Sequence, residues 1–452
     1  MTERRLKFLL INPTANEWRI NPGEKPKKRT QIFRYSMLSS LYVAAAMPSS
    51  VETTIVDEEI EPIDFDTDAD LIGISFMTFN APRAYEIADT FRREKGKKVI
   101  VGGFHPSFLP EEALQHADAV CIGEAEHNVP RMIEDYRSGR LQSTYKSDVV
   151  DLKGLPIPPR HLIRKSSYSI VDTVQASRGC PHRCTFCSIT SFFDHTYRSR
   201  PVDEVIEEIR PLGKYLLFMD DNITTNPEYA KELFAKMIPL GKRWFSQCST
   251  RIAYDEKLLD LAERSGCSGL FIGFESLSQD GLKEWNKSFN RSKDYEKAVQ
   301  RIHAHGIGIC AAMVFGNDCD TTEIFPRTLD FLLKANIDVL QATILTPFPG
   351  TPLFRDMDKE GRITDKNWGH YDFRHVVFEP SKMSPDELKK GHDWVLSNFY
   401  SSRSVARRLR NELRYLSPST MLRATIPLNL SYRSRLAADG TFGMNGTKRL
   451  AL

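Results

Sequence analysis

Residues 177–187 read Ser-Arg-Gly-Cys-Pro-His-Arg-Cys-Thr-Phe-Cys, and they hold three of the eight cysteines in this chain of 452 residues. Cys180, Cys184 and Cys187 are separated by three and then by two residues. Thiolates at this spacing can bind three irons of a cubane iron–sulfur cluster and leave the fourth iron open. An open iron can ligate a substrate, so the segment predicts a reactive cluster rather than a simple electron carrier.

The same segment resembles the signature of radical S-adenosylmethionine enzymes, in which an aromatic residue, here Phe186, precedes the third cysteine. The resemblance implies a 4Fe-4S cluster held by the three cysteines. It also implies that the amino and carboxylate groups of S-adenosylmethionine chelate the open iron, and that one electron cleaves the sulfonium to a 5′-deoxyadenosyl radical. A flavodoxin- or ferredoxin-type electron donor is therefore an expected partner.

A zinc site or a disulfide scaffold fits the cysteines less well than a cluster does. A structural zinc ion normally takes four ligands, and the nearest candidate, His182, lies inside the cysteine loop. A disulfide scaffold does not fit eight cysteines spread unevenly over 452 residues. The remaining cysteines form no second trio, which argues against a methylthiotransferase with an additional cluster; they are Cys121, Cys248, Cys267, Cys310 and Cys319.

Strand-like runs recur from the residues just before the cysteine loop to residue 345. Intervals of roughly 25 to 40 residues leave room for one helix each, which is the cadence of a partial β/α barrel with six strands. Functional groups of such barrels lie at the carboxyl ends of the strands, and the cysteine loop comes directly after the first run. The runs are Val171–Ala176, Tyr215–Met219, Trp244–Cys248, Gly269–Phe274, Ile307–Val314 and Val339–Leu345.

Polar residues follow the second, third and fourth of these runs. Carboxylates there can bind the ammonium and the ribose hydroxyls of S-adenosylmethionine, and the second-strand and fourth-strand positions match motifs of the radical family. For Asp220 or Asp221 the alternative is that the side chain caps the following helix. The predicted residues for this cofactor are Phe186, Asp220, Asp221, Asn222, Arg251, Glu275 and Ser276.

The first third of the chain has its own alternation of strands and helices, with helical patterns such as Ala81–Arg93 between strand-like runs. Such alternation predicts an α/β fold with a doubly wound, Rossmann-like parallel sheet, whose ligand crevice lies at the carboxyl ends of the strands. The runs are Lys7–Ile11, Thr53–Val56, Leu71–Phe76, Lys98–Val101 and Ala119–Ile122.

Loops after these strands resemble those of cobalamin-binding domains. Domains of that family carry Ser-x-Leu after the third strand and Gly-Gly after the fourth, and here Ser75-Phe76-Met77 and Gly102-Gly103 fall at similar places. Glycines there let the backbone approach a ligand closely. The residues that the resemblance assigns to cobalamin are Ser75, Met77, Thr78, Gly102, Gly103, His105, Gly123 and Glu124.

Two features leave the cobalamin assignment open. The first loop, Asn12 to Asn16, lacks the Asp-x-His-x-x-Gly motif that would bring a histidine to the lower face of cobalt. That absence is usual in cobalamin-dependent radical methylases, and it also fits a domain that kept the fold and lost the cofactor. His105 is either a cofactor contact or a structural residue that forms hydrogen bonds in its loop.

The C-terminal region is helical and basic. Ser384-Pro385-Asp386-Glu387 predicts a capping box that starts a helix running past Tyr400. Residues 401–452 hold ten Lys and Arg against two acidic residues. The following helix could pack on the barrel or contact an anionic membrane surface. Its apolar stripe is Val405, Leu409, Leu413 and Leu416, and its basic stripe is Arg403, Arg407, Arg410 and Arg414.

The composition is that of an ordinary globular protein, with 41% hydrophobic residues and a net charge of +3. No apolar run reaches the length of a signal peptide or a membrane span, so we expect a cytoplasmic protein that could lie at the inner membrane surface. No ladder of aromatic residues among basic ones suggests nucleic acid. We expect a cobalamin-binding domain at 1–150, a linker at 151–165, the barrel at 166–360 and a helical extension with a basic tail at 361–452.

Taken together, these resemblances imply a cobalamin-dependent radical S-adenosylmethionine methylase that acts on an unactivated carbon of a small-molecule or lipid substrate. The adenosyl radical would abstract a substrate hydrogen, methylcobalamin would give the methyl group, and a second S-adenosylmethionine would remethylate the cobalamin. One alternative is ring closure or carbon–carbon coupling on the same fold. The other is a non-catalytic protein that binds a metal cluster.

Overall fold

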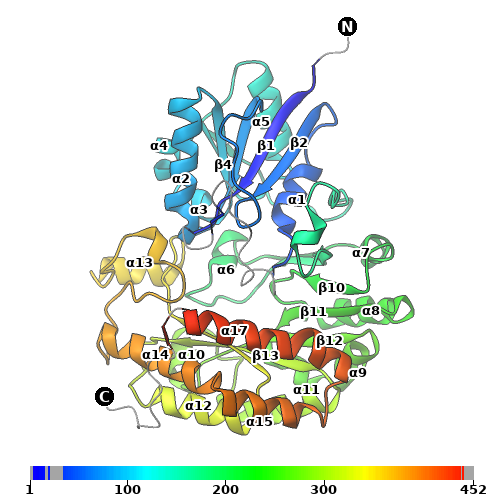
Figure 1. The fold of residues 1–452 in the computed structure, drawn as a ribbon, viewed down its shortest axis with the longest axis vertical. Coiled ribbons are helices and arrows are strands. Elements are labelled where there is room, and N and C mark those ends of the chain that lie inside the picture. Colours follow the sequence, from blue (N-terminus) through cyan, green and yellow to red (C-terminus); the bar gives the residue numbers. More distant parts are fainter. Residues whose placement is uncertain (1–3, 16–18, 21–33, 439, 442–452) are drawn as a thin grey trace.

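The computed structural model describes residues 4–15, 19–20, 34–438 and 440–441. Two parallel sheets lie one above the other, and helices of the C-terminal region cover the outside of the second sheet (Figure 1). Asn16 of the first loop and residues 442–452 of the basic tail lie outside the described residues. No described helix has both the length and the apolar character needed to cross a membrane.

The first sheet has the strand order β2-β1-β3-β4-β5-β6, and all its pairings are parallel. Its strands are β1 (Leu6–Asn12), β2 (Val51–Asp57), β3 (Leu71–Ser75), β4 (Lys98–Gly102), β5 (Ala119–Ile122) and the unexpected short β6 (Thr144–Lys146). Its helices are α1 (Leu38–Ala45), α2 (Ala81–Asp89), α3 (Phe104–Phe108), α4 (Pro110–His116) and α5 (Asn128–Arg137).

Strand β1 shows why the central strands of this sheet are mostly apolar. Phe8 and Leu10 belong to the core that includes residues of α1 and α5, whereas Leu9 and Ile11 belong to the core that includes residues of α2. Side chains alternate between the two faces of a strand, so helices on both faces require apolar residues at every position. The doubly wound sheet expected from the sequence is therefore confirmed.

The second sheet has the order β14-β13-β12-β11-β10-β7, again all parallel. Its strands are β7 (Thr173–Val174), β10 (Tyr215–Phe218), β11 (Arg243–Cys248), β12 (Cys267–Glu275), β13 (Gly308–Phe315) and β14 (Val339–Ile344). The edge strands β7 and β14 do not pair with each other, which leaves an incomplete barrel of six strands, as expected. Between its strands lie α7 (Val202–Ile209), α8 (Pro227–Met237), α9 (Glu256–Arg264), α10 (Gln279–Glu284), α11 (Tyr295–Ala304) and α12 (Ile324–Lys334).

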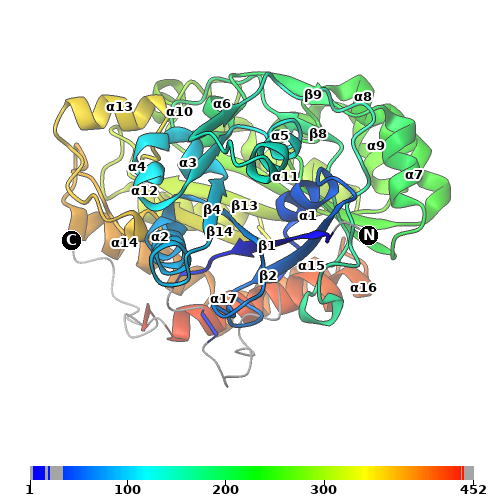
Figure 2. The same cartoon turned by 90° about the horizontal axis from the view of Figure 1, so that it is seen from above.

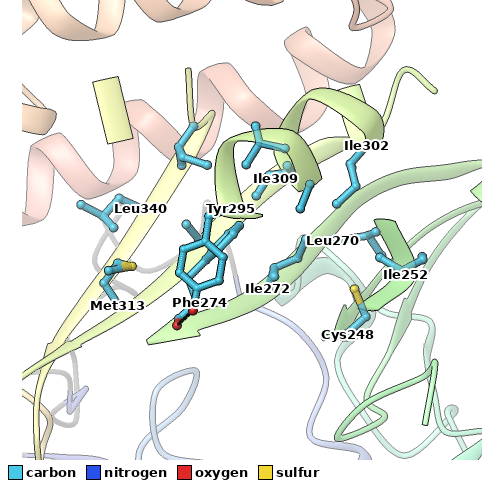
Figure 3. Packing of buried hydrophobic residues seen from close by; sticks show 14 of the residues in the cluster. Cys248, Ile252, Leu270, Ile272, Phe274, Tyr295, Ile302, Ile309, Met313 and Leu340 are labelled. Carbon is cyan, nitrogen blue, oxygen red and sulfur yellow. Dashed lines mark hydrogen bonds between the residues drawn. The ribbon is translucent and has the colours of Figure 1, made fainter. Parts of the chain in front are cut away.

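The core of the barrel lies between these strands and the outer helices. Figure 3 shows Leu270, Ile272 and Phe274 of β12 packed among residues of β13 and of α11. The alternate residues Phe271 and Gly273 face the inner side and are only half-buried. The inner face of the sheet is thus the more open one, where a ligand could lie.

Short elements connect these layers. A hairpin of β8 (Ser177–Gly179) and β9 (Tyr197–Ser199) brackets the cysteine loop and α6 (Ser188–Phe192), and α13 (Pro352–Lys359) follows the sixth strand. Single helical turns or short π-helices occupy Thr78–Asn80, Thr90–Glu94, Lys165–Ser167, Ile238–Leu240, Thr250–Tyr254, Ser292–Asp294, Trp368–His370 and Met421–Thr425.

The C-terminal helices are α14 (Pro385–Phe399), α15 (Ser402–Glu412), α16 (Pro418–Thr420) and α17 (Ile426–Ala438). The capping box of Ser384 and Glu387 is present at the start of α14. The expectation that this helix continues past Tyr400 is wrong, because the Ser401 side chain accepts a hydrogen bond from the Ser404 amide and caps a new helix. Figure 2 shows α15, α16 and α17 together along one side of the molecule.

Candidate active site between the two sheets

The cysteine loop starts at a tight turn and ends on a helix. Gly179 has φ +82°, and a Cβ there would collide with the Thr196 carbonyl oxygen, so only glycine fits where the chain leaves β8. Cys180 and Cys187 are half-buried, Cys184 is buried, and all three are free cysteines. Cys187 is also the residue from which α6 starts.

The donor set fits an iron–sulfur cluster. Burial raises the pKa of the Cys184 thiol to about 12 and also raises the pKa values of Cys180 and Cys187. Such thiolates need a strong positive partner, and iron supplies one. Within the described ranges no three His, Cys, Asp or Glu side chains converge on a single-ion site. A cubane binds each thiolate to a different iron, so its ligands surround a volume instead of meeting at one point.

His182, the only zinc ligand that the sequence offered inside the loop, is engaged elsewhere. Its ring stacks on Phe289 with centroids 4.0 Å apart and an interplanar angle of 18°. Burial, together with nearby Lys287 and Arg251, lowers the pKa of His182 and favours the neutral ring. The contacts of His182 are therefore with Phe289, and they do not place its ring as a fourth metal ligand beside the three cysteines.

Lys287 is a buried cation beside the cysteine loop that the sequence pattern did not predict. Its ammonium pairs with the Glu275 carboxylate and lies 6.0 Å from the centroid of the Phe186 ring. Burial alone would lower the pKa of Lys287, but Glu275 and the thiols of Cys184 and Cys187 outweigh it and raise that pKa. The lysine therefore keeps its charge next to the cysteines.

The lysine pair also explains an unusual backbone. Glu275, the last residue of β12, has φ +66°, which an L-residue rarely adopts. A Cβ on Gly273 would collide with the Glu275 carboxylate, so the pair lies directly over Gly273 on the inner face of the barrel. No sequence signal identified Lys287, because a lysine well beyond a strand end is common and its burial is a tertiary effect.

Asp220 and Asp221 hold the strand that enters the cysteine loop. Asp220 accepts hydrogen bonds from the Ala176 amide at 3.0 Å and the Ser177 hydroxyl at 2.5 Å. Asp221 accepts one from the Gly179 amide at 2.8 Å. Burial raises the pKa of Asp220 to about 7 and that of Asp221 to about 6.

Neither aspartate caps the following helix, so the capping alternative is wrong for both. The cap of α8 is Asn226, whose side chain accepts a hydrogen bond from the Tyr229 amide. The remaining residues predicted for S-adenosylmethionine lie at the same edge. The Asn222 side chain accepts a hydrogen bond from the Thr224 hydroxyl, and the Ser276 hydroxyl accepts one from the Ser278 amide. Arg251 is exposed, and its charge lies close enough to His182 to help lower the pKa of that histidine.

The loops of the first sheet form a glycine-lined edge. Gly103 has φ +108°, and a Cβ there would lie 2.5 Å from the Phe76 carbonyl oxygen, so the loops after β3 and β4 touch. Gly123, after β5, has φ +79° with no atom within 4 Å of the place where a Cβ would point. Met77 beside them is 40% exposed. The edge combines close backbone contact with open space, which fits a large flat cofactor such as cobalamin.

The other residues predicted for cobalamin differ in accessibility. Ser75 and Gly102 are half-buried and Thr78 is buried. His105 is fully buried, with Nε2 at 3.1 Å from both the Tyr85 hydroxyl and a Glu112 oxygen. The Trp368 ring packs edge-on against His105 and donates its indole N–H to Glu112 at 2.9 Å. These contacts are those of a structural histidine.

Glu124 links the two sheets. One of its oxygens lies 2.7 Å from Arg178 and the other 2.8 Å from Arg198, while Arg178 also pairs with Glu126 at 2.6 Å. Arg178 immediately precedes Gly179 and the first cysteine of the loop, and Glu124 follows Gly123. Buried charges need paired partners, so this cluster fixes the cysteine loop against the glycine-lined edge.

Aromatic contacts reinforce this junction. Phe104 of α3 packs on Phe192 of α6 with ring centroids 4.4 Å apart. The Phe108 ring occupies the place where a Cβ of Gly350 would lie, in the proline-rich loop after β14. That loop contacts the cysteine loop in turn, because the Leu353 amide donates to the Thr185 carbonyl at 3.0 Å. The carboxyl edges of both sheets therefore face one another.

Two surface hollows lie elsewhere. One, of about 460 Å³, is lined by Arg92, Lys97, Lys98 and their neighbours at the start of β4. The start of a strand is the opposite end of the sheet from the glycine-lined edge. The other, of about 470 Å³, lies over α5. The cysteine loop lines neither of them.

Family models match both parts of the chain. The Radical SAM superfamily model matches residues 174–332, and the B12 binding domain model matches residues 36–133. The chain is 34% identical over 408 residues to Bacteriochlorophyllide d C-12(1)-methyltransferase of Chlorobaculum tepidum, covering 86% of this chain and 89% of that protein. It is 29% identical to Bacteriochlorophyllide d C-8(2)-methyltransferase of the same organism, covering 75% and 79%.

The fold is also found among solved structures. The radical S-adenosylmethionine methyltransferase TsrM of Kitasatospora setae, solved with cobalamin and a [4Fe-4S] cluster bound, superposes with a TM-score of 0.67. The alignment covers 96% of this chain and 100% of that chain at 15% identity. At this identity the likeness shows the fold alone, and the fold is a cobalamin-binding domain above a radical barrel.

Proposed function

Since this chain belongs to the cobalamin-binding radical S-adenosylmethionine methyltransferases, we propose that it methylates an unactivated carbon on a tetrapyrrole related to the bacteriochlorophyllides. The observation that carries this proposal is the junction of Arg178 with Glu124. It sets the cysteine loop against the glycine-lined edge, so a hydrogen acceptor and a methyl donor could act on the same substrate.

The family carries a 4Fe-4S cluster, S-adenosylmethionine and cobalamin. When bound, these groups supply a 5′-deoxyadenosyl radical and a transferable methyl group. We assign the cluster to Cys180, Cys184 and Cys187. The protein's own part is to hold the cofactors in place and to exclude water.

Several side chains have roles in that placement. Asp220 and Asp221 fix the strand before the loop through the amides of Ala176 and Gly179. Glu275 offers a carboxylate to the ammonium or ribose of S-adenosylmethionine, and the ion pair with Lys287 orients that carboxylate. Gly103 lets the loops after β3 and β4 touch, Gly123 leaves open space for the corrin ring, and Glu124 holds the two cofactor edges together.

The inner face of the barrel favours a large, flat substrate. Phe245 and Phe271 are half-buried there and Gln247 is exposed, whereas their neighbours along the strands are buried. Aromatic rings with a free face suit stacking on a macrocycle. The two Chlorobaculum tepidum relatives are named for reactions on bacteriochlorophyllide d, and the first covers most of this chain at 34% identity. We therefore favour a tetrapyrrole over a lipid as the substrate.

The proposal is tested by anaerobic assay of protein reconstituted with iron, sulfide and cobalamin. Bacteriochlorophyllide d, reductant and S-adenosylmethionine with a deuterated methyl group are added, and products are followed by mass spectrometry. We expect 5′-deoxyadenosine, S-adenosylhomocysteine and a pigment carrying one labelled methyl group. Cys184→Ala is the matched control, since it removes one cluster ligand.

The possible outcomes test the substrate, the radical chemistry and the methyl transfer separately. Formation of 5′-deoxyadenosine without pigment methylation would reject the tetrapyrrole while keeping the radical chemistry, and a lipid would be tried next. A pigment altered by ring closure, without the label, would reject methyl transfer. Replacing the chemical reductant by flavodoxin or ferredoxin tests the expected electron donor.

A further inference from the structure

Exposed arginines run along α15 and the turn that follows it. Arg403, Arg407 and Arg410 are exposed and recur at the three- to four-residue interval that places them on one face of α15, and the exposed Arg414 follows in the turn after the helix. No other described residue forms an ion pair with Arg403, Arg410 or Arg414. Several exposed lysines elsewhere on the molecule are paired, as Lys98 is with Asp118 and Lys334 with Asp330.

The same region exposes leucines. Among the described residues, the exposed leucines are Leu413, Leu422 and Leu430, with exposed fractions of 65%, 68% and 54%. All three lie within eighteen residues of the sequence: Leu413 caps the end of α15, Leu422 lies in the π-helical turn Met421–Thr425, and Leu430 lies in α17. Single exposed leucines are common, but their concentration beside a basic row needs an explanation.

The helices that carry these residues form a fixed unit, here called the C-terminal hairpin (residues 402–438). Arg408 is fully buried and donates to the Asn429 side chain at 2.8 Å and to the Asp338 carbonyl at 2.6 Å. Glu412, the only acidic residue of the hairpin, is fully buried and accepts from the Thr425 hydroxyl at 2.7 Å. Within residues 402–438, therefore, no acidic side chain offsets the positive charge of the exposed arginines.

We propose that the outward face of the C-terminal hairpin docks on an anionic phospholipid surface. Arginines attract acidic headgroups, and the leucines beside them can enter the boundary between headgroups and acyl chains. A nucleic acid would also attract the arginines, but it offers nothing to exposed leucines. Figure 2 shows α15, α16 and α17 along the same side of the molecule.

Vesicle flotation with the full-length, cofactor-loaded protein tests this inference. Vesicles of phosphatidylcholine alone are compared with vesicles that also contain phosphatidylglycerol. We expect binding to the anionic vesicles only, weakening as salt is raised. The variant Arg403→Ser/Arg410→Ser/Arg414→Ser should bind roughly a hundredfold more weakly, and Leu413→Ser/Leu422→Ser/Leu430→Ser roughly tenfold more weakly.

Matched controls lie on the first sheet's side of the molecule. Arg137→Ser/Arg140→Ser/Lys146→Ser removes the same charge from exposed positions, and Ile157→Ser removes an exposed apolar side chain. Both controls should bind as the wild type does. Equal binding to neutral vesicles, binding unchanged by either hairpin variant, or an equal loss in the controls would each overturn the proposal. Circular dichroism and thermal unfolding of every variant show whether a loss reflects misfolding.

Discussion

Arg178 and Glu124 form a buried ion pair of 2.7 Å that joins the strand entering the cysteine loop to the loop after β5 of the first sheet. The residues are 54 positions apart in the sequence, and Arg178 lies in β8 of the short hairpin whereas Glu124 lies in the loop after β5. The pair fixes the distance between the two candidate cofactor edges. Weakening it should therefore uncouple the two reactions, so that radicals form without a matching transfer of methyl groups.

Glu124→Gln should lower the free energy of unfolding by about 3 kcal/mol, because it leaves Arg178 and Arg198 short of a buried counter-charge. It should also raise the yield of 5′-deoxyadenosine per methyl group transferred. Both are measured, by thermal unfolding and by product analysis. Glu61→Gln, which breaks the exposed pair with Arg164, is the control and should cost less than about 0.5 kcal/mol. An unchanged product ratio in Glu124→Gln would show that the pair does not position the cofactors.

Lys287→Met should make the cluster harder to reduce. A reduced cluster carries more negative charge, and the buried ammonium near Cys184 and Cys187 stabilises it. We expect the midpoint potential to fall by roughly 50 mV, measured by redox titration with electron paramagnetic resonance. Lys283→Met, at an exposed lysine paired with Asp280, is the control and should leave the potential unchanged. A potential equal to that of the wild type in Lys287→Met would contradict this assignment.

Gly103 and Gly123 offer a matched pair of substitutions at the glycine-lined edge. Gly103→Ala introduces a left-handed alanine and a clash with the Phe76 carbonyl, so it should cost about 3 kcal/mol of stability. Gly123→Ala also places an alanine at a positive φ, here +79°, but with open space around it, so it should cost about 1 kcal/mol. The methyl group at 123 should nevertheless reduce bound cobalt, measured by metal analysis, if the corrin lies against this loop. Full cobalt occupancy would place the corrin elsewhere.

The sequence predicted the framework well because its signals are local. Apolar runs such as Lys98–Val101 and Ala119–Ile122 lie within strands β4 and β5, since parallel strands covered on both faces are mostly apolar. The cysteine spacing is also local, because three ligands of one cluster lie within a single loop. The short strand β6 was missed, as three residues carry too little pattern.

The contacts that join the two halves could not be predicted. Arg178 lies next to the cysteines, but its partner Glu124 is identified only once both sheets are folded and in contact. Lys287 likewise has no local signal, and its function depends on burial beside Glu275. Residues that act across an interface between domains have no fixed spacing in the sequence, whereas residues that share one loop do.

Asp320, in the loop after β13, should make stability depend on pH. Its carboxylate accepts from the amides of Gly316 and Asn317, and burial raises its pKa from 3.8 to about 7. Because the folded state binds this proton more tightly than the unfolded state, the contribution is favourable below pH 4 and is lost as pH rises to 7. Asp320→Asn should therefore gain stability over the wild type with rising pH, by at most about 4 kcal/mol at pH 8.

The neighbouring Asp318 should behave in the opposite way. Burial alone would raise the pKa of Asp318, but its pairing with Arg362 at 2.5 Å outweighs burial and lowers that pKa. Its stabilising effect is present at neutral pH and is lost as pH falls through the lowered folded-state pKa, so Asp318→Asn should destabilise the protein at pH 7 but not in acid. Urea unfolding of both variants between about pH 2 and pH 8 checks the two signs together, because Asp318 titrates below its usual pKa and Asp320 titrates above it. The same pH dependence in both variants would contradict the opposite pKa shifts of Asp320 and Asp318.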